Sequence, residues 1–188
     1  MQTCLLVIDA QQSFALRPYF DPRRAQLWLQ AQNALIRGCV AARVPLLRIL
    51  HSDGPERADN PFARCSGQVR AIDGLEAFEP AAEFVKSRHS ALVGTGLSVW
   101  LVRHGVRRLM VSGIRTEQCC ETTARHASDM GWEVDFVSPA TLSFDMDIPG
   151  GGILAADDIV LRSEVVLRDR FATICGVEQA LERAVAAG

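Results

Sequence analysis

The alternation of short apolar runs with longer amphipathic stretches constrains the fold of this chain more than any other feature. Apolar runs of about four to eight residues are typical of strands buried on both faces, as in a parallel sheet. Parallel strands need long crossover connections, and the amphipathic stretches are typical of helices that supply them. We therefore expect a three-layer α/β/α sandwich with a mostly parallel central sheet of about six strands.

The chain has 188 residues, which fits one domain, and we expect that domain to cover 1–188. A polar segment with Pro and Gly, 51–80, is expected to be a long loop. The expected strands are CLLVID (4–9), VPLLRIL (44–50), AEFVK (82–86), RRLMVSG (107–113), WEVDFV (132–137) and FATIC (171–175). The expected helices are 21–42, 96–105, a helix within 113–132, 156–170 and 177–188.

The charged residues nearly cancel, with 22 acidic against 20 basic side chains, and the basic ones do not cluster. This composition gives no sign of a nucleic-acid partner, and no apolar run is long enough to cross a membrane. The N-terminal segment lacks the basic region and the cleavage site of a signal peptide. The six cysteines form no C-x-x-C pair, which argues against zinc-ribbon and thioredoxin-like sites. We expect a cytoplasmic protein whose thiols are mostly reduced and buried.

Three expected strands end in, or just before, residues that can carry chemistry. Asp9 ends the first, Lys86 ends the third, and Gly113 ends the fourth just before Cys119 and Cys120. Ligands of open α/β sheets bind beyond the carboxyl ends of the strands, so an acid, a base and a thiol are expected at one edge. Each residue alone also has a structural explanation, as a helix cap, a solvated lysine or a core thiol.

A helix would place the two adjacent cysteines differently. Thr116 is a suitable N-cap, so Cys119 falls in the first turn, where backbone N–H groups and the helix dipole favour a thiolate. Glu117 would oppose a thiolate if its side chain pointed the same way, and spacing alone therefore favours Cys119 only slightly. Cys120 points about 100° away around the helix and is expected in the core. It would share a stripe of small residues with Ala124, Ala127 and Gly131.

The chain resembles the isochorismatase-like cysteine hydrolases, a group that includes nicotinamidases, N-carbamoylsarcosine amidohydrolases and isochorismatases. Three blocks carry the resemblance: LLVIDAQQSF, FVKSRHSALVGTGL, and VSGIRTEQCCETTARHASDMGWEV followed by PATLSFD. Their order and spacing are more specific than any one block. The resemblance implies a Rossmann-like hydrolase domain with a catalytic triad of Asp9, Lys86 and Cys119. The family pattern and the helix geometry thus select the same cysteine.

The resemblance also implies acyl transfer through a Cys119 thioester, with Asp9 moving the proton and Lys86 holding both groups by charge. It implies an oxyanion hole formed by the backbone N–H groups of Arg115 and Cys119. A cis peptide between Ile114 and Arg115 is expected on the same ground.

Three residues are candidates for contact with a substrate. Phe14 is a pocket wall by family analogy and equally well a core phenylalanine. Thr116 lies beside the expected nucleophile. Arg115 departs from the small or apolar residue usual in the family, and its guanidinium could bind a substrate carboxylate. An ion pair of Arg115 with Glu117, or with another subunit, explains it at least as well.

The metal site of the family's nicotinamidases is incomplete in this sequence. Asp53 keeps the carboxylate, but Pro55 and Arg64 stand where two histidines would be. We therefore expect no metal and no cofactor, and nicotinamidase activity is disfavoured. His51 is expected to be a histidine bonded to loop backbone rather than a catalytic one.

The expected function is a metal-independent cysteine hydrolase that cleaves an amide or carbamoyl bond of a small molecule. The alternatives are vinyl-ether hydrolysis of the isochorismatase type, in which the cysteine can be replaced, and a non-catalytic member of the family. The expected partners are a small-molecule substrate and, as the resemblance implies, further copies of the chain in a homodimer or larger homo-oligomer. Neither nucleic acid nor a membrane is expected to bind.

Overall fold

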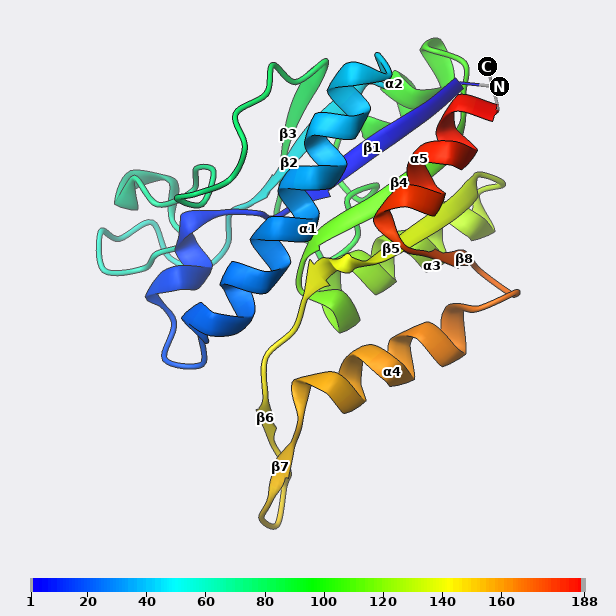
Figure 1. Cartoon of the computed structure of the whole chain (residues 1–188). Coiled ribbons are helices and arrows are strands. Elements are labelled where there is room, and N and C mark those ends of the chain that lie inside the picture. The colour runs from blue at the N-terminus through cyan, green and yellow to red at the C-terminus, as the bar shows by residue number, and fades with distance from the viewer. Residues whose placement is uncertain (1, 187–188) are drawn as a thin grey trace.

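A computed structural model describes residues 2–186. Six parallel strands form the central sheet in the order β3-β2-β1-β4-β5-β8 (Figure 1). Each strand lies where the sequence predicts one, and the α/β/α fold is confirmed. The strands are β1 (Gln2–Ile8), β2 (Leu46–His51), β3 (Ala82–Lys86), β4 (Val106–Ile114), β5 (Glu133–Leu142) and β8 (Thr173–Cys175).

Helices cover both faces of this sheet. The helices are α1 (Pro22–Ala41), α2 (Leu97–Arg103), α3 (Glu121–Asp129), α4 (Ala156–Leu167) and α5 (Val177–Ala186). Helices α1 and α5 pack on one face and α2 and α3 on the other, with α4 beside α3 (Figure 1). The start of α1 follows from its sequence, because the Asp21 side chain accepts hydrogen bonds from the N–H groups of Arg23 and Arg24 and Pro22 begins the helix.

The two faces have separate apolar cores, and β1 supplies both. Leu5 and Val7 pack toward α1 and α5, whereas Leu6 and Ile8 pack toward α2 and α3. This alternation is the two-residue period of a strand. All four side chains are buried, which explains why the run is apolar throughout instead of alternating with polar residues.

Gly113 lets β1 and β4 approach each other closely at the end of the sheet. Its φ is +125°, and a Cβ atom at this position would lie 1.8 Å from the carbonyl oxygen of Ile8. Only glycine fits such a contact. Just before this point the register between β4 and β5 shifts, and β5 continues to Leu142, which pairs with Ile114. Strand β5 is therefore longer than the strand predicted over 132–137.

A small antiparallel hairpin was not predicted. It consists of β6 (Met146–Asp147) and β7 (Ile153–Leu154), joined through three glycines with positive φ, and it projects beyond the sheet (Figure 1). The predicted long loop over 51–80 is largely irregular, with one short 3-10 turn at Arg64–Ser66. Within residues 2–186, the helices are too short or too polar to cross a membrane.

Candidate active site

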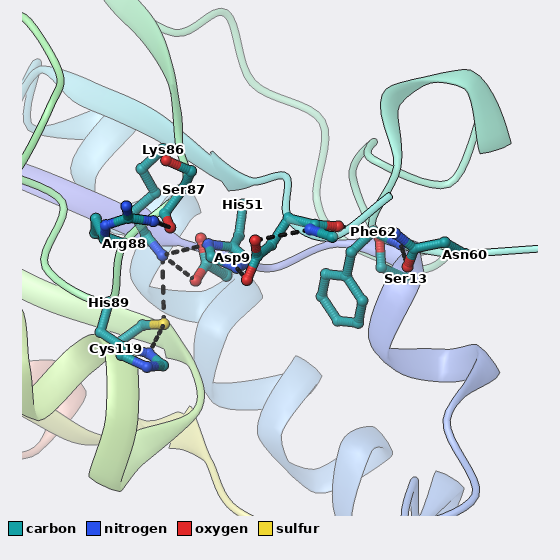
Figure 2. Close-up of polar contacts among 12 residues, drawn as sticks. Asp9, Ser13, His51, Asn60, Phe62, Lys86, Ser87, Arg88, His89 and Cys119 are labelled. Atoms are coloured by element: carbon teal, nitrogen blue, oxygen red, sulfur yellow. Dashed lines mark hydrogen bonds and ion pairs between the residues drawn. The ribbon is translucent and has the colours of Figure 1, made fainter. Parts of the chain in front are cut away.

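Asp9, Lys86 and Cys119 come together at the carboxyl edge of the sheet (Figure 2). Lys86 Nζ donates to Asp9 Oδ2 at 2.7 Å and lies 3.3 Å from Cys119 Sγ. The three residues are 0%, 2% and 5% exposed. The structure therefore brings together the acid, the base and the thiol that the ends of the strands predicted.

The backbone positions each of these residues. Asp9 directly follows β1 with a φ of +50°, a left-handed conformation that Asp tolerates better than most residues. Its N–H donates to the carbonyl of Ile49 at 2.8 Å, which holds it against β2. Lys86 is the last residue of β3 and the only lysine in the chain. A lysine ammonium carries three N–H donors on one atom, and at this site it has three acceptors around it.

The third acceptor is His51, the last residue of β2. Its Nδ1 lies 3.3 Å from Lys86 Nζ (Figure 2). The prediction that His51 is only a loop histidine is therefore incomplete. Strand order explains the contact, because β2 lies between β1 and β3 and His51 pairs in register with Lys86. The sequence signal is a polar residue at the end of a strand, but the neighbours of that strand cannot be read from the sequence.

The thiol of Cys119 is held in its protonated form. Burial raises the pKa of the Cys119 thiol above its ordinary value, the Asp9 carboxylate raises it further, and the Lys86 ammonium lowers it. Burial therefore acts against the thiolate that the start of a helix would favour, because desolvation disfavours a buried anion. The reactive form must arise as the proton leaves.

An acceptor for that proton lies in the same cluster. Asp9 Oδ1 is buried and, among residues 2–186, receives no hydrogen bond. A buried carboxylate oxygen without a donor is uncommon and calls for an explanation. Burial alone would lower the pKa of Lys86, but the charge of the Asp9 carboxylate and the hydrogen bonds to Asp9 and Cys119 outweigh burial and raise it. Lys86 is thus a charged ammonium with no lone pair, and the Asp9 carboxylate is the group that can accept the proton.

The chain around the cysteines is a π-helical turn, Thr116–Cys120, that leads into α3. The prediction that Thr116 is the N-cap is wrong, because the N-cap is Arg115. The Thr116 hydroxyl instead donates to Thr141 Oγ1 at 2.9 Å. Turns of this kind are frequent at functional sites. Cys120 is wholly buried in the core, as predicted, and burial raises the pKa of its thiol.

A cavity of about 310 Å³ opens beside the Cys119 sulfur. Phe14 lines it and is also part of the core, so both interpretations of that residue hold. His89 reaches Cys119 from the loop after β3, with Nδ1 3.8 Å from Sγ. Neither Arg115 nor Thr116 is among the lining residues. These are Phe14, Arg17, Tyr19, His51, Asp53, Gly54, Asn60, Phe62, His89, Gln118 and Cys119.

The side chain of Arg115 lies behind the cavity wall rather than in the cavity. Its Nε forms an ion pair with Glu117 Oε1 at 2.8 Å, and both side chains are about nine-tenths buried. The guanidinium carbon lies 5.1 Å from the ring centre of Tyr19 and 5.6 Å from that of Phe144. The structure therefore favours the ion pair over contact with a substrate carboxylate. The peptide bond between Ile114 and Arg115 is cis.

The residues at the position of the nicotinamidase metal site do not fit a metal ion. Asp53 is largely exposed, and its Oδ2 lies 3.9 Å from His51 Nε2. Pro55 and Arg64 supply no ligand atoms. Across residues 2–186, no three His, Cys, Asp or Glu side chains are grouped so that they could hold a metal ion.

Comparison with known proteins adds independent evidence. The family model for the isochorismatase domain matches residues 3–150. Nicotinamidase 3 of Arabidopsis thaliana is 30% identical over 156 residues, which cover 77% of this chain and 75% of that protein. The isochorismatase family protein YrdC of Bacillus subtilis is 29% identical over 125 residues, or 65% of this chain and 67% of that one. An isochorismatase-family crystal structure from Burkholderia xenovorans matches with a TM-score of 0.86 and 26% identity, covering 98% of this chain and 88% of that one.

Proposed function

Because the chain belongs to the isochorismatase family and is a hydrolase, we propose that it cleaves an amide or carbamoyl C–N bond of a small molecule through a Cys119 thioester, without a metal. The observation that carries this proposal is the ammonium of Lys86 between the Asp9 carboxylate and the Cys119 sulfur. Two of the three metal-ligand positions hold Pro55 and Arg64, which supports a reaction driven by side chains alone.

In the first half of the reaction, the Cys119 thiol gives its proton to Asp9 Oδ1 as Sγ attacks the carbonyl carbon of the substrate. The new C–S bond places negative charge on the carbonyl oxygen. The backbone N–H groups of Arg115 and Cys119 would donate to that oxygen. Lys86 holds the sulfur and the carboxylate in position and offsets the charge on both. A thiol that is protonated at rest needs such a general base at the moment of attack.

In the second half, the tetrahedral intermediate collapses. Asp9 returns its proton to the nitrogen of the breaking C–N bond, the amine or ammonia leaves, and a thioester remains on Cys119. Asp9 then takes a proton from water as the water oxygen attacks the thioester carbon. The C–S bond breaks, the acid is released, and the proton returns to the sulfur. One water is consumed, and Asp9 and Cys119 return to their starting protonation states.

A panel of primary amides and N-carbamoyl compounds tests the proposal. The assay would measure release of ammonia and, after an acid quench, the intact mass of the protein. We expect ammonia from wild type and from Cys120→Ala, a matched control at a core thiol, and none from Cys119→Ala. An acyl adduct should map to Cys119. The proposal fails if Cys119→Ala keeps the activity of wild type, or if only a vinyl ether such as isochorismate is turned over and no adduct forms.

A further inference from the structure

The ammonium of Lys86 is surrounded by acceptors from three different strands or strand ends. Asp9 Oδ2 lies at 2.7 Å, Cys119 Sγ at 3.3 Å and His51 Nδ1 at 3.3 Å. An ammonium has three N–H bonds and no lone pair. Each bond therefore has one acceptor, and none of the three is redundant. The proposed reaction uses two of them, Asp9 and Cys119, and leaves the role of the third open.

The position of His51 is fixed by the residues around it. The N–H of His51 donates to Gln11 Oε1 at 2.7 Å, and its carbonyl accepts from Gln11 Nε2 at 2.9 Å. Gln11 is wholly buried and also donates to Ser13 Oγ. The imidazole ring packs edge-on against Phe62, with ring centres 5.9 Å apart. These two hydrogen bonds, from one buried side-chain amide to the backbone of His51, hold the ring where it faces Lys86.

The chemistry of the contact defines the protonation of the ring. Lys86 can only donate, so Nδ1 of His51 must accept, and the ring proton must be on Nε2. We propose that His51 is a positioning residue: as a neutral Nε2–H tautomer it accepts the third N–H of Lys86 and so holds the ammonium between Asp9 and Cys119. This inference rests on the proposed function, because it assigns a role around the same nucleophile.

The electrostatics support a neutral ring. Burial lowers the pKa of His51, and so does the Lys86 charge on β3; His89, from the loop after β3, also lowers it. Asp9 after β1 and Asp53 after β2 act in the opposite direction without reversing the shift. When acid protonates His51, Nδ1 becomes a donor and the ring a cation. The ammonium then loses an acceptor and faces a like charge, so it must move away from its position.

Nuclear magnetic resonance can observe this contact directly, because Lys86 is the only lysine among 188 residues. Selective ¹⁵N labelling of lysine side chains yields one resonance, that of Lys86 Nζ. We expect it to shift with an inflection below the ordinary histidine pKa of 6.5, and to lose that inflection in His51→Asn. The control His104→Asn, at an exposed histidine stacked on Trp100, should keep it.

The ring tautomer gives a second test that needs no variant. A long-range ¹H–¹⁵N spectrum at neutral pH should show His51 with its proton on Nε2. A proton on Nδ1, or an imidazolium at pH 7, overturns the inference. So does an inflection of the Lys86 signal that persists in His51→Asn.

Alkylation of Cys119 by iodoacetamide, followed by peptide mapping, separates positioning from mere packing. His51→Leu removes the acceptor, and we expect alkylation about tenfold slower, since hydrogen bonds to charged groups are among the stronger ones. His51→Asn keeps an acceptor oxygen near the place of Nδ1 and should stay within about threefold of wild type. Equal rates in wild type and a folded His51→Leu overturn the inference and leave the proposed function intact. By contrast, full hydrolytic activity in Cys119→Ala contradicts the proposed function itself.

Discussion

Raising the pH from 7 to 10 should remove roughly 7 kcal/mol of folding free energy, because five thiols are buried in the native protein and ionise in the unfolded chain. Burial raises the pKa of Cys39 to about 12 and that of Cys175 to about 11, and burial also raises the pKa of the other three. All are at most 5% exposed. The five are Cys4, Cys39, Cys119, Cys120 and Cys175.

The sign and the magnitude follow from proton linkage. Above an ordinary thiol pKa of 9.0, the unfolded chain has released these protons and the native protein still holds them. The unfolded state then binds fewer protons, so stability falls as pH rises. At pH 10 an unfolded thiol is about nine-tenths ionised, which costs about 1.4 kcal/mol per thiol, or about 7 kcal/mol for five. A domain is stable by roughly 5–15 kcal/mol in total.

The composition makes this a clean experiment. Arginine does not titrate in this range, and the chain has one lysine and one tyrosine. The pKa of Lys86 is raised above its ordinary 10.5, so Lys86 contributes little at pH 10. The loss between pH 9 and 10 therefore reports mainly on thiols.

Urea unfolding at a series of pH values, under reducing conditions, measures the effect. Cys39→Ala should lower the free energy of unfolding at pH 7. Above pH 9, unfolding of this variant should release about one proton fewer than unfolding of wild type, so its stability should fall less steeply with pH. Cys65→Ser, at the exposed cysteine, should change the slope far less. If the slope of stability against pH between pH 9 and 10 corresponds to one proton or fewer released on unfolding, the claim that the buried thiols stay protonated is refuted.

Two further predictions concern the backbone that supports the site. Gly113→Ala should cost at least about 3 kcal/mol of folding free energy, because the left-handed φ is strained for alanine and the new Cβ would lie 1.8 Å from the carbonyl oxygen of Ile8. Urea unfolding measures this loss, and a stability within about 1 kcal/mol of wild type contradicts the prediction. Gln11→Leu removes both hydrogen bonds to the backbone of His51 and should cost about 1–3 kcal/mol while slowing alkylation of Cys119. Unchanged stability together with unchanged alkylation would show that the Gln11 amide does not hold His51.

The sequence predicts the sheet and the three central residues for the same physical reason. Doubly buried parallel strands are apolar runs, and their carboxyl ends meet at one edge. Asp9, Lys86 and the segment with Cys119 follow such runs, so their meeting could be expected without knowing the strand order. The role of His51 could not be expected, because it depends on β2 lying between β1 and β3.

The errors at the site come from packing that local rules do not describe. The start of a helix favours a thiolate at Cys119, but burial of the sulfur raises the pKa of the thiol. The rule for helix starts also makes Thr116 a cap, whereas the chain forms a π-helical turn and the hydroxyl bonds to β5. For Arg115, the sequence allows either a substrate carboxylate or an ion pair with a protein carboxylate, and only the folded chain shows the guanidinium against Glu117.

The central claim is that Lys86 links the Asp9 carboxylate to the Cys119 thiol. The most direct test is the pH dependence of Cys119 alkylation in wild type, Asp9→Asn and the double variant Asp9→Asn/Lys86→Met. The carboxylate raises the pKa of the thiol and the ammonium lowers it. Replacing both members of a buried ion pair by neutral groups of similar size is often tolerated, so the double variant should fold.

We predict that Asp9→Asn speeds alkylation of Cys119, because the ammonium is left to stabilise the thiolate alone, and that the added Lys86→Met slows it again. The thiol pKa should fall in the first variant and rise in the second. Equal alkylation profiles in the three proteins would show that Cys119 is not coupled to Asp9 and Lys86, and would contradict the account.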